Sequence, residues 1–159
     1  MEILVKHIEP GNSEHKNLFE SLFREYLSGF SVAFDPAVIE QLFALSYFHG
    51  FMSFIDDKPA GFAVCFESFS TYRLQRVMNI HDFMVANRCR GKGVGKAQLY
   101  AIEQYCRDNH YLKITLEVAD DNVAAKKLYS SCQYEDYRVV LKGQQHWQKY
   151  LNNRNKALI

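Results

Sequence analysis

The seven residues Arg90-Gly91-Lys92-Gly93-Val94-Gly95-Lys96 decide the fold of this 159-residue chain, and they hold three of its eight glycines. They join a strand expected over residues 77–85 to a helix expected over residues 93–109. Glycine lets backbone N–H groups turn toward an anion, and a helix N-terminus adds the positive end of a dipole. Together with its basic side chains, the segment predicts a cradle for a diphosphate.

The spacing of these glycines separates one phosphate-binding motif from another. A P-loop needs a longer interval than that between Gly91 and Gly95, and it needs Ser or Thr after its lysine, whereas alanine follows Lys96. A dinucleotide fingerprint needs a third glycine in place of that lysine, and it normally opens a domain. The pattern that fits is R-x-x-G-x-G, carried by Arg90, Gly93 and Gly95. A basic surface turn before a helix is the structural alternative.

Hydrophobic periodicity and turn residues predict a single α/β domain over residues 1–159. Strands are expected over residues 3–8, 51–55, 61–69, 77–85, 112–118 and 134–141. Helices are expected over residues 13–29, 36–50, 93–109 and 122–131. The second helix is expected to start after an N-cap at Asp35 and to end at Gly50. The tail from Gln145 is expected to form a strand around residues 146–151, or a helix.

Further motifs agree with this order of elements. The pattern R-x-x-G-x-G resembles the acetyl-CoA-binding motif of the GCN5-related N-acetyltransferase (GNAT) superfamily. Asn122-Val-Ala-Ala-Lys-Lys-Leu-Tyr129 is similar to the superfamily's second signature, N-x-x-A-x-x-L-Y, and residues 80–85 resemble its fourth strand. One departure is Gln133, where the superfamily usually has glycine. The resemblance covers nearly the whole chain. It implies a mixed, mostly antiparallel sheet, with splayed parallel central strands 4 and 5 and flanking helices.

The resemblance also implies how acetyl-CoA binds as a cosubstrate. The splayed strand offers backbone groups to pantetheine, and the glycine-rich segment holds the pyrophosphate. The implied cofactor-binding residues are Phe83, Met84, Val85, Arg90, Gly91, Lys92, Gly93, Val94, Gly95, Lys96, Asn122 and Ala125. No metal is implied.

Two residues are implied to carry the chemistry, in which an amine attacks the thioester directly. Tyr129 matches the position of the family's proton donor to the departing thiolate, and a phenol of reference pKa about 10 is protonated at neutral pH. His81 takes the place of a glutamate in the polyamine acetyltransferases. A histidine, of reference pKa about 6.5, is suited to relay the amine's proton. The structural alternatives are a core tyrosine and a strand histidine bonded to a neighbour.

The implied acceptor is a small-molecule primary amine, with a polyamine or diamine as the leading hypothesis. Glu25, Glu67 and Asp82 are candidates to attract a cationic amine. Amino-acid, antibiotic and protein N-terminal acceptors stay open. A non-catalytic CoA-binding sensor on the same fold is a second class, which Tyr129 disfavours because a sensor needs no proton donor. A nucleic-acid-binding domain that uses the basic loop is a third.

Composition limits the class of protein. Nineteen Lys and Arg residues face eighteen Asp and Glu, and this formal net charge of +1 disfavours a nucleic-acid partner. No apolar run approaches the roughly 18 residues that span a bilayer, and the start lacks a signal peptide, so we expect a cytoplasmic protein without a membrane partner. Cys65, Cys89, Cys106 and Cys132 form no C-x-x-C pair; Cys65 and Cys106 are expected to be core residues, and Cys89 an incidental thiol. A homodimer is one expected assembly.

Overall fold

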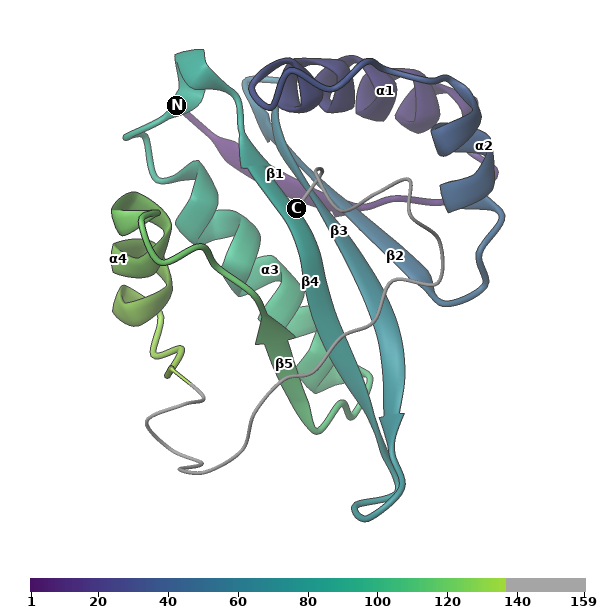
Figure 1. The fold of residues 1–159 in the computed structure, drawn as a ribbon, viewed down its shortest axis with the longest axis vertical. Coiled ribbons are helices and arrows are strands. Elements are labelled where there is room, and N and C mark those ends of the chain that lie inside the picture. Colours follow the sequence, from purple (N-terminus) through teal and green to yellow (C-terminus); the bar gives the residue numbers. More distant parts are fainter. Residues whose placement is uncertain (137–159) are drawn as a thin grey trace.

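The computed structural model describes residues 1–136, which form one mixed sheet with helices on both faces (Figure 1). The strand order is β1-β2-β3-β4-β5, in which β4 and β5 are parallel and every other pair is antiparallel. The strands are β1 (Ile3–His7), β2 (Phe48–Ile55), β3 (Lys58–Ser70), β4 (Gln75–Val85) and β5 (Lys113–Leu116). The predicted mixed α/β sheet is therefore confirmed.

Two hydrophobic clusters hold the helices on the sheet. The helices are α1 (Ser13–Ser28), α2 (Ala37–Phe43), α3 (Val94–Asp108) and α4 (Val123–Ser131), with a short 3₁₀ turn η1 (Asn87–Cys89). One cluster joins the sheet to α1 and α2, and contains Phe19, Phe23 and Phe62. The other joins it to α3 and α4, and contains Leu99, Ile102 and Tyr129. No helix in the described part of the chain is long and apolar enough to cross a membrane.

The second predicted helix is wrong in its C-terminal half. The N-cap position is Pro36, one residue after the predicted Asp35, although Asp35 Oδ1 accepts a hydrogen bond of 2.9 Å from Ala37 N at the start of the helix. The helix ends at Phe43, and Gly50 lies inside β2. A Cβ on Gly50 would lie 2.6 Å from Ile8 Cδ1, so this glycine permits a close approach to the segment after β1. A glycine needed for close packing looks the same in sequence as one that ends a helix.

The other boundaries differ less. The strand expected over residues 112–118 is shorter, and the loop expected over residues 86–91 contains η1. Of the strand expected over residues 134–141, the described residues 134–136 have no regular structure. The remainder of that strand, and the element expected in the tail, lie outside the described residues.

The parallel pair opens in the middle of β4. Pairing between β4 and β5 runs from Val77 opposite Lys113 to Ile80 opposite Leu116. Beyond Ile80, β4 continues to Val85 while the chain after β5 turns toward α4 (Figure 1). This is the predicted splay of the parallel strands.

A β-bulge lies at the start of the opening. On β3, Val64 pairs with Asp82 and the next residue pairs with Ile80, so His81 is the extra residue. A bulge breaks the alternation of side chains between the two faces. His81 and Asp82 accordingly both contact residues of the α1 side, since His81 packs on Phe66 and Asp82 bonds Tyr26.

Candidate active site

The glycine-rich segment forms a turn that leads into α3. Gly91 and Gly93 have φ values of +73° and +85°, in the left-handed region that side chains disfavour. Gly93 is the N-cap of α3, makes no side-chain cap, and is followed by a first turn without an acidic residue. A Cβ on Gly91 would meet nothing within 4 Å, so space is open beside the turn. The exposed N–H groups and the open space fit an anion such as a pyrophosphate.

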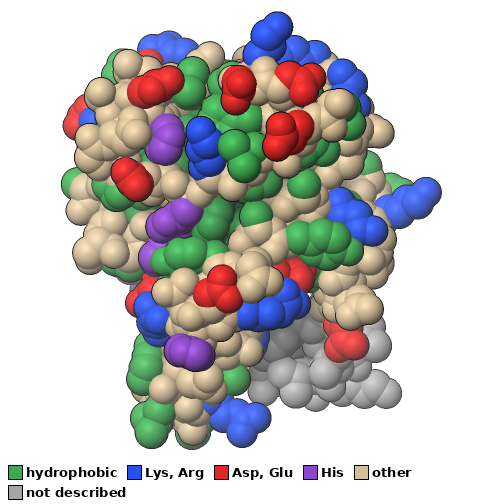
Figure 2. Space-filling view, turned by 180° about the vertical axis from the view of Figure 1, so that it is seen from behind, with side chains coloured by type: hydrophobic (Ala, Val, Ile, Leu, Met, Phe, Trp, Pro, Cys, Tyr) green, Lys and Arg blue, Asp and Glu red, His purple; other side chains and the backbone are tan. Residues whose placement is uncertain are grey.

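Positive charge surrounds this turn. A cavity of about 340 Å³ beside it is lined by Ile55, Asp56, Lys58, Pro59, Arg88, Cys89 and Lys92. Three of these residues are basic, and Lys58 reaches the cavity from the start of β3, outside the motif. Seen from behind, basic and acidic side chains are intermixed on the surface (Figure 2). Beside the turn itself, three basic residues and one acidic residue, Asp56, line the cavity.

Three residues of the segment have structural contacts as well. Val94 is buried in the core, and a Cβ on Gly95 would lie 2.9 Å from Leu128 Cδ2, so the absent side chain lets α3 pack closely on α4. Arg90 Nε donates to the carbonyl oxygen of Val85 at 3.3 Å, which holds the turn against the end of β4.

The last residues of β4 offer backbone groups at the opening. Phe83, Met84 and Val85 pair with β3 on one edge. On the other edge, the described residues supply no strand partner beyond Ile80. Apart from the Val85 carbonyl, which accepts from Arg90, the N–H and C=O groups on that edge make no strand pairing within residues 1–136 and fit an extended amide chain such as pantetheine. Met84 is buried, and Phe83 packs on the α3 side.

Tyr129 lies across the opening from β4. It is 8% exposed, and its ring centroid lies 6.0 Å from that of Phe83. Burial raises the pKa of the Tyr129 phenol, so it stays protonated at neutral pH. Asn122, the N-cap of α4, accepts a hydrogen bond of 3.1 Å from Ala125 N. That cap orients the helix that carries Tyr129.

The residues at the bulge differ in their surroundings. His81 is exposed, and its ring lies 5.3 Å from the ring of Phe66. Asp82 is half-buried, and its Oδ1 accepts a hydrogen bond of 3.0 Å from the hydroxyl of Tyr26 on α1. Burial, followed by the charge and hydrogen bond of Asp82 and the proximity of Tyr129, raises the pKa of Tyr26.

Tyr26 is a site residue that sequence reasoning missed. Its position in the apolar stripe of residues 18–27 predicts only a core contact, and nothing in a single sequence pairs it with a residue 56 positions away. The only sign in the sequence is the residue type: phenylalanine or leucine would fill this apolar position equally well, whereas a tyrosine adds a hydroxyl that needs a hydrogen-bond partner when it is buried.

The three candidate carboxylates for a cationic acceptor do not converge. Glu25 accepts from Asn87 N at 3.1 Å and pairs with Arg88 at 3.4 Å. Glu67 lies in a separate cluster that faces α3. Its carboxylate lies within hydrogen-bond distance of His49 Nε2, at 3.3 Å, forms an ion pair of 3.6 Å with Arg76, and accepts from the hydroxyl of Tyr111. Asp82 alone of the three is placed at the opening.

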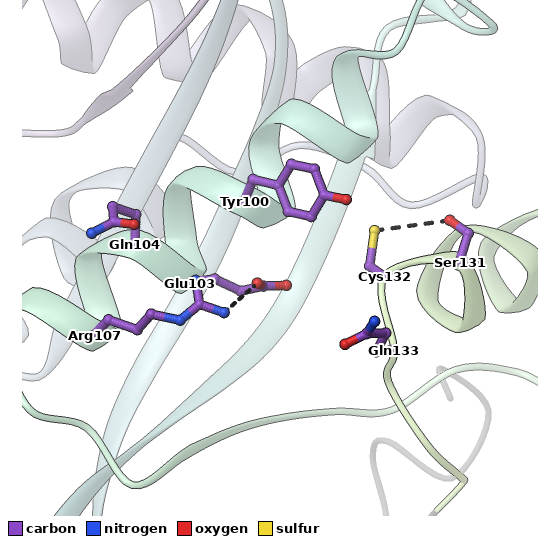
Figure 3. Close-up of a pocket in the computed structure, with 7 residues that line it drawn as sticks. All are labelled: Tyr100, Glu103, Gln104, Arg107, Ser131, Cys132 and Gln133. Atoms are coloured by element: carbon purple, nitrogen blue, oxygen red, sulfur yellow. Dashed lines mark hydrogen bonds and ion pairs between the residues drawn. The ribbon is translucent and has the colours of Figure 1, made fainter.

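A second cavity, of about 350 Å³, lies between the later turns of α3 and the end of α4 (Figure 3). Its lining residues are Tyr100, Glu103, Gln104, Arg107, Ser131, Cys132 and Gln133. Glu103 and Arg107 form an ion pair of 3.0 Å there. None of the predicted site residues lines it. Among residues 1–136, no group of His, Cys, Asp and Glu is arranged to hold a metal ion.

The chain matches the family model described as the acetyltransferase (GNAT) family over residues 16–134. It belongs to this family.

Two curated relatives resemble part of the chain. It is 30% identical over 76 residues to the uncharacterized N-acetyltransferase YhfO of Bacillus subtilis (strain 168), and the matched region covers 48% of this chain and 51% of that protein. It is 26% identical over 86 residues to the thialysine N-epsilon-acetyltransferase of Caenorhabditis elegans, and the matched region covers 54% of this chain and 53% of that protein. The chain thus spans about half the length of the curated relatives it matches.

Solved structures share the fold over nearly the whole chain. The aminoglycoside acetyltransferase meta-AAC0020 from an uncultured soil metagenomic sample, in complex with trehalose, has a TM-score of 0.77 at 16% identity. The match covers 94% of this chain and 97% of that one. The aminoglycoside N-acetyltransferase AAC(6')-Iy in complex with CoA has a TM-score of 0.70 at 15% identity, and the match covers 96% and 95%.

Proposed function

We propose that the protein is an acetyl-CoA-dependent N-acetyltransferase that acts on a small-molecule primary amine. The observation that carries this proposal is the continuity of the site. The anion-binding turn at Gly91 and Gly93 follows directly from the free edge of β4, and Tyr129 lies across the opening from that edge. Pyrophosphate, pantetheine and thioester sulfur require these three features in this order. Membership of the acetyltransferase family supports the same conclusion.

Acetyl-CoA supplies an activated acyl group as a thioester. The turn at residues 90–96 holds its pyrophosphate, and the backbone of residues 83–85 holds pantetheine. The acceptor reaches the site as an ammonium ion and loses one proton to His81, which passes it to solvent. The neutral amine attacks the carbonyl carbon, a C–N bond forms and the C–S bond breaks. Tyr129 gives its proton to the thiolate and regains one from the amide nitrogen, so one proton is released per turnover.

The acceptor class is proposed to be a polyamine or diamine. An acidic residue at the opening, Asp82, favours a cationic molecule. The relative from Caenorhabditis elegans is named for an epsilon amine, and two structural neighbours are named for aminoglycosides, so small amine-bearing molecules recur among proteins similar to this one. The homodimer and the cytoplasmic location stay predictions.

The test is a panel of amines incubated with the protein and acetyl-CoA, with release of free thiol as the readout. We expect thiol release that depends on the amine and is fastest with a diamine. Tight binding of CoA without thiol release from any amine would favour the sensor. Salt-dependent retention of DNA, unaffected by CoA, would favour the nucleic-acid-binding domain.

A further inference from the structure

Asp82 is a carboxylate with a hydroxyl partner but no cationic one. Among residues 1–136, Asp82 accepts a hydrogen bond from the hydroxyl of Tyr26 and takes part in no ion pair. Burial and the charge of Asp82 both contribute to the raised pKa of Tyr26 and of the buried Cys65 thiol, so both of these groups are neutral at neutral pH. A half-buried carboxylate without a counter-charge attracts a cation from solution.

Tyr26 holds this carboxylate in one orientation. The Tyr26 ring packs edge-on against Phe62 at 5.5 Å and against Phe30 at 5.0 Å, so the hydroxyl has a fixed position on α1. It donates to Oδ1 of Asp82, which leaves Oδ2 available to a second donor. A hydrogen bond to an ionised group is about twice as strong as one between neutral groups.

The location of this pair relates it to the reacting atoms. The bulge turns Asp82 toward α1 directly after the last β4–β5 pair, Ile80 with Leu116. Tyr129 approaches the same region from α4 and lies near enough to Tyr26 to interact electrostatically. Phe30, beside Tyr26, is 61% exposed and offers an aromatic face on the solvent side. An alkylammonium ion fits such surroundings, because it pairs with a carboxylate and also packs on aromatic rings.

We propose that Tyr26 is a positioning residue that holds Asp82 for binding the attacking ammonium group of the acceptor. This inference rests on the proposed function, which it deepens by naming the group that receives the amine. This contact involves only the reacting ammonium group, because Asp82 is placed beside the reacting atoms, and it does not itself distinguish a monoamine from a diamine. His81, on the same strand, then accepts the proton.

The experiment measures binding separately from turnover. Butylamine is titrated calorimetrically into protein saturated with CoA, and 1-butanol serves as the uncharged probe. We expect wild type to bind butylamine and not 1-butanol. Tyr26→Phe keeps the ring and removes only the hydroxyl, so it should weaken butylamine binding about tenfold, equivalent to about 1.4 kcal/mol, without changing CoA affinity. In turnover it should raise the amine KM more than it lowers kcat.

A double-mutant cycle distinguishes positioning from general damage. Asp82→Asn should weaken butylamine binding more than Tyr26→Phe does, and Tyr26→Phe added to Asp82→Asn should change it less than twofold. The matched control is Tyr105→Phe, which alters a hydroxyl 3.4 Å from His49 Nδ1 in the separate cluster and should leave amine binding unchanged.

Four results would overturn the inference. They are unchanged butylamine affinity in Tyr26→Phe, equal losses with and without the Asp82 carboxylate, a matching loss of CoA affinity, and failure of wild type to bind butylamine. Thiol release with the amine panel is independent of all four. If the wild-type protein releases thiol with an amine but Tyr26→Phe binds butylamine as well as wild type does, the proposed function stands and only the positioning role of Tyr26 is refuted.

Discussion

Tyr129 and Tyr111 are both buried tyrosines, but we predict that the hydroxyl of Tyr129 acts in catalysis and that the hydroxyl of Tyr111 stabilises the fold. Tyr129 is 8% exposed and Tyr111 is 9% exposed. Tyr111 donates to the carboxylate of Glu67, whereas the structure gives the Tyr129 hydroxyl no hydrogen-bond partner among residues 1–136. Replacing each by phenylalanine therefore separates catalysis from stability within one molecule.

The expected magnitudes follow from these contacts. Tyr129→Phe removes no described hydrogen bond, so the free energy of unfolding should change by less than about 0.5 kcal/mol. Its turnover should fall by about 10²- to 10⁴-fold, because a positioned proton donor is lost. Tyr111→Phe removes a hydrogen bond to a charged group, worth about 1.5–3 kcal/mol, and should lower the Tm by about 3–12 °C for a domain of this size. Its turnover should stay near that of wild type.

The assays are thiol release with saturating acetyl-CoA and an accepted amine, and thermal unfolding with and without CoA. Both variants should keep the CoA-dependent rise in Tm. Unchanged turnover in Tyr129→Phe would show that water or another side chain protonates the thiolate. A large fall in the Tm of Tyr129→Phe would show instead that its hydroxyl stabilises the fold.

Three further predictions concern the anion-binding turn, the proton relay and alkaline pH. Gly93→Asp should abolish the rise in Tm that acetyl-CoA causes, because it brings a carboxylate to the anion site and a side chain to a φ of +85°; a normal rise would mean that the cradle is misassigned. His81→Ala should remove the fall in kcat/KM on the acidic side of the pH profile, and His81→Glu should retain part of the rate. If that fall instead shifts with the pKa of each amine tested and His81→Ala keeps full activity, His81 has a structural role. Folding raises the pKa of the Cys65 and Cys106 thiols and of the Tyr26, Tyr111 and Tyr129 phenols, so the unfolded chain loses these protons first as the pH rises. Stability should therefore begin to fall near the reference pKa of a thiol, about 8.5, and fall more steeply above the phenol value of about 10. Chemical denaturation at about pH 7 and about pH 11 measures the difference.

Local chemistry made the glycine-rich turn before α3 predictable. Glycine at a positive φ, basic neighbours and a helix start are properties of consecutive residues, so Gly91 and Gly93 identify the turn without knowledge of the rest of the fold. The cap of α4 by Asn122 is local in the same way. In the described sheet each strand pairs with its successor along the chain, so the strand order β1-β2-β3-β4-β5 is the same as the order of the strands in the sequence.

Contacts between distant segments were decided by the tertiary structure alone. The sequence does not distinguish Gly50 as a point of close packing from a helix stop, because only the position of Ile8 makes the difference. A bulge depends on two strands at once, so the common face of His81 and Asp82 depends on the register of β3. Tyr26 belongs to the apolar stripe of α1 and cannot be told apart from the other residues of that stripe by its position. Its hydrogen bond to Asp82 forms because the packing of α1 on the sheet brings together two residues 56 positions apart.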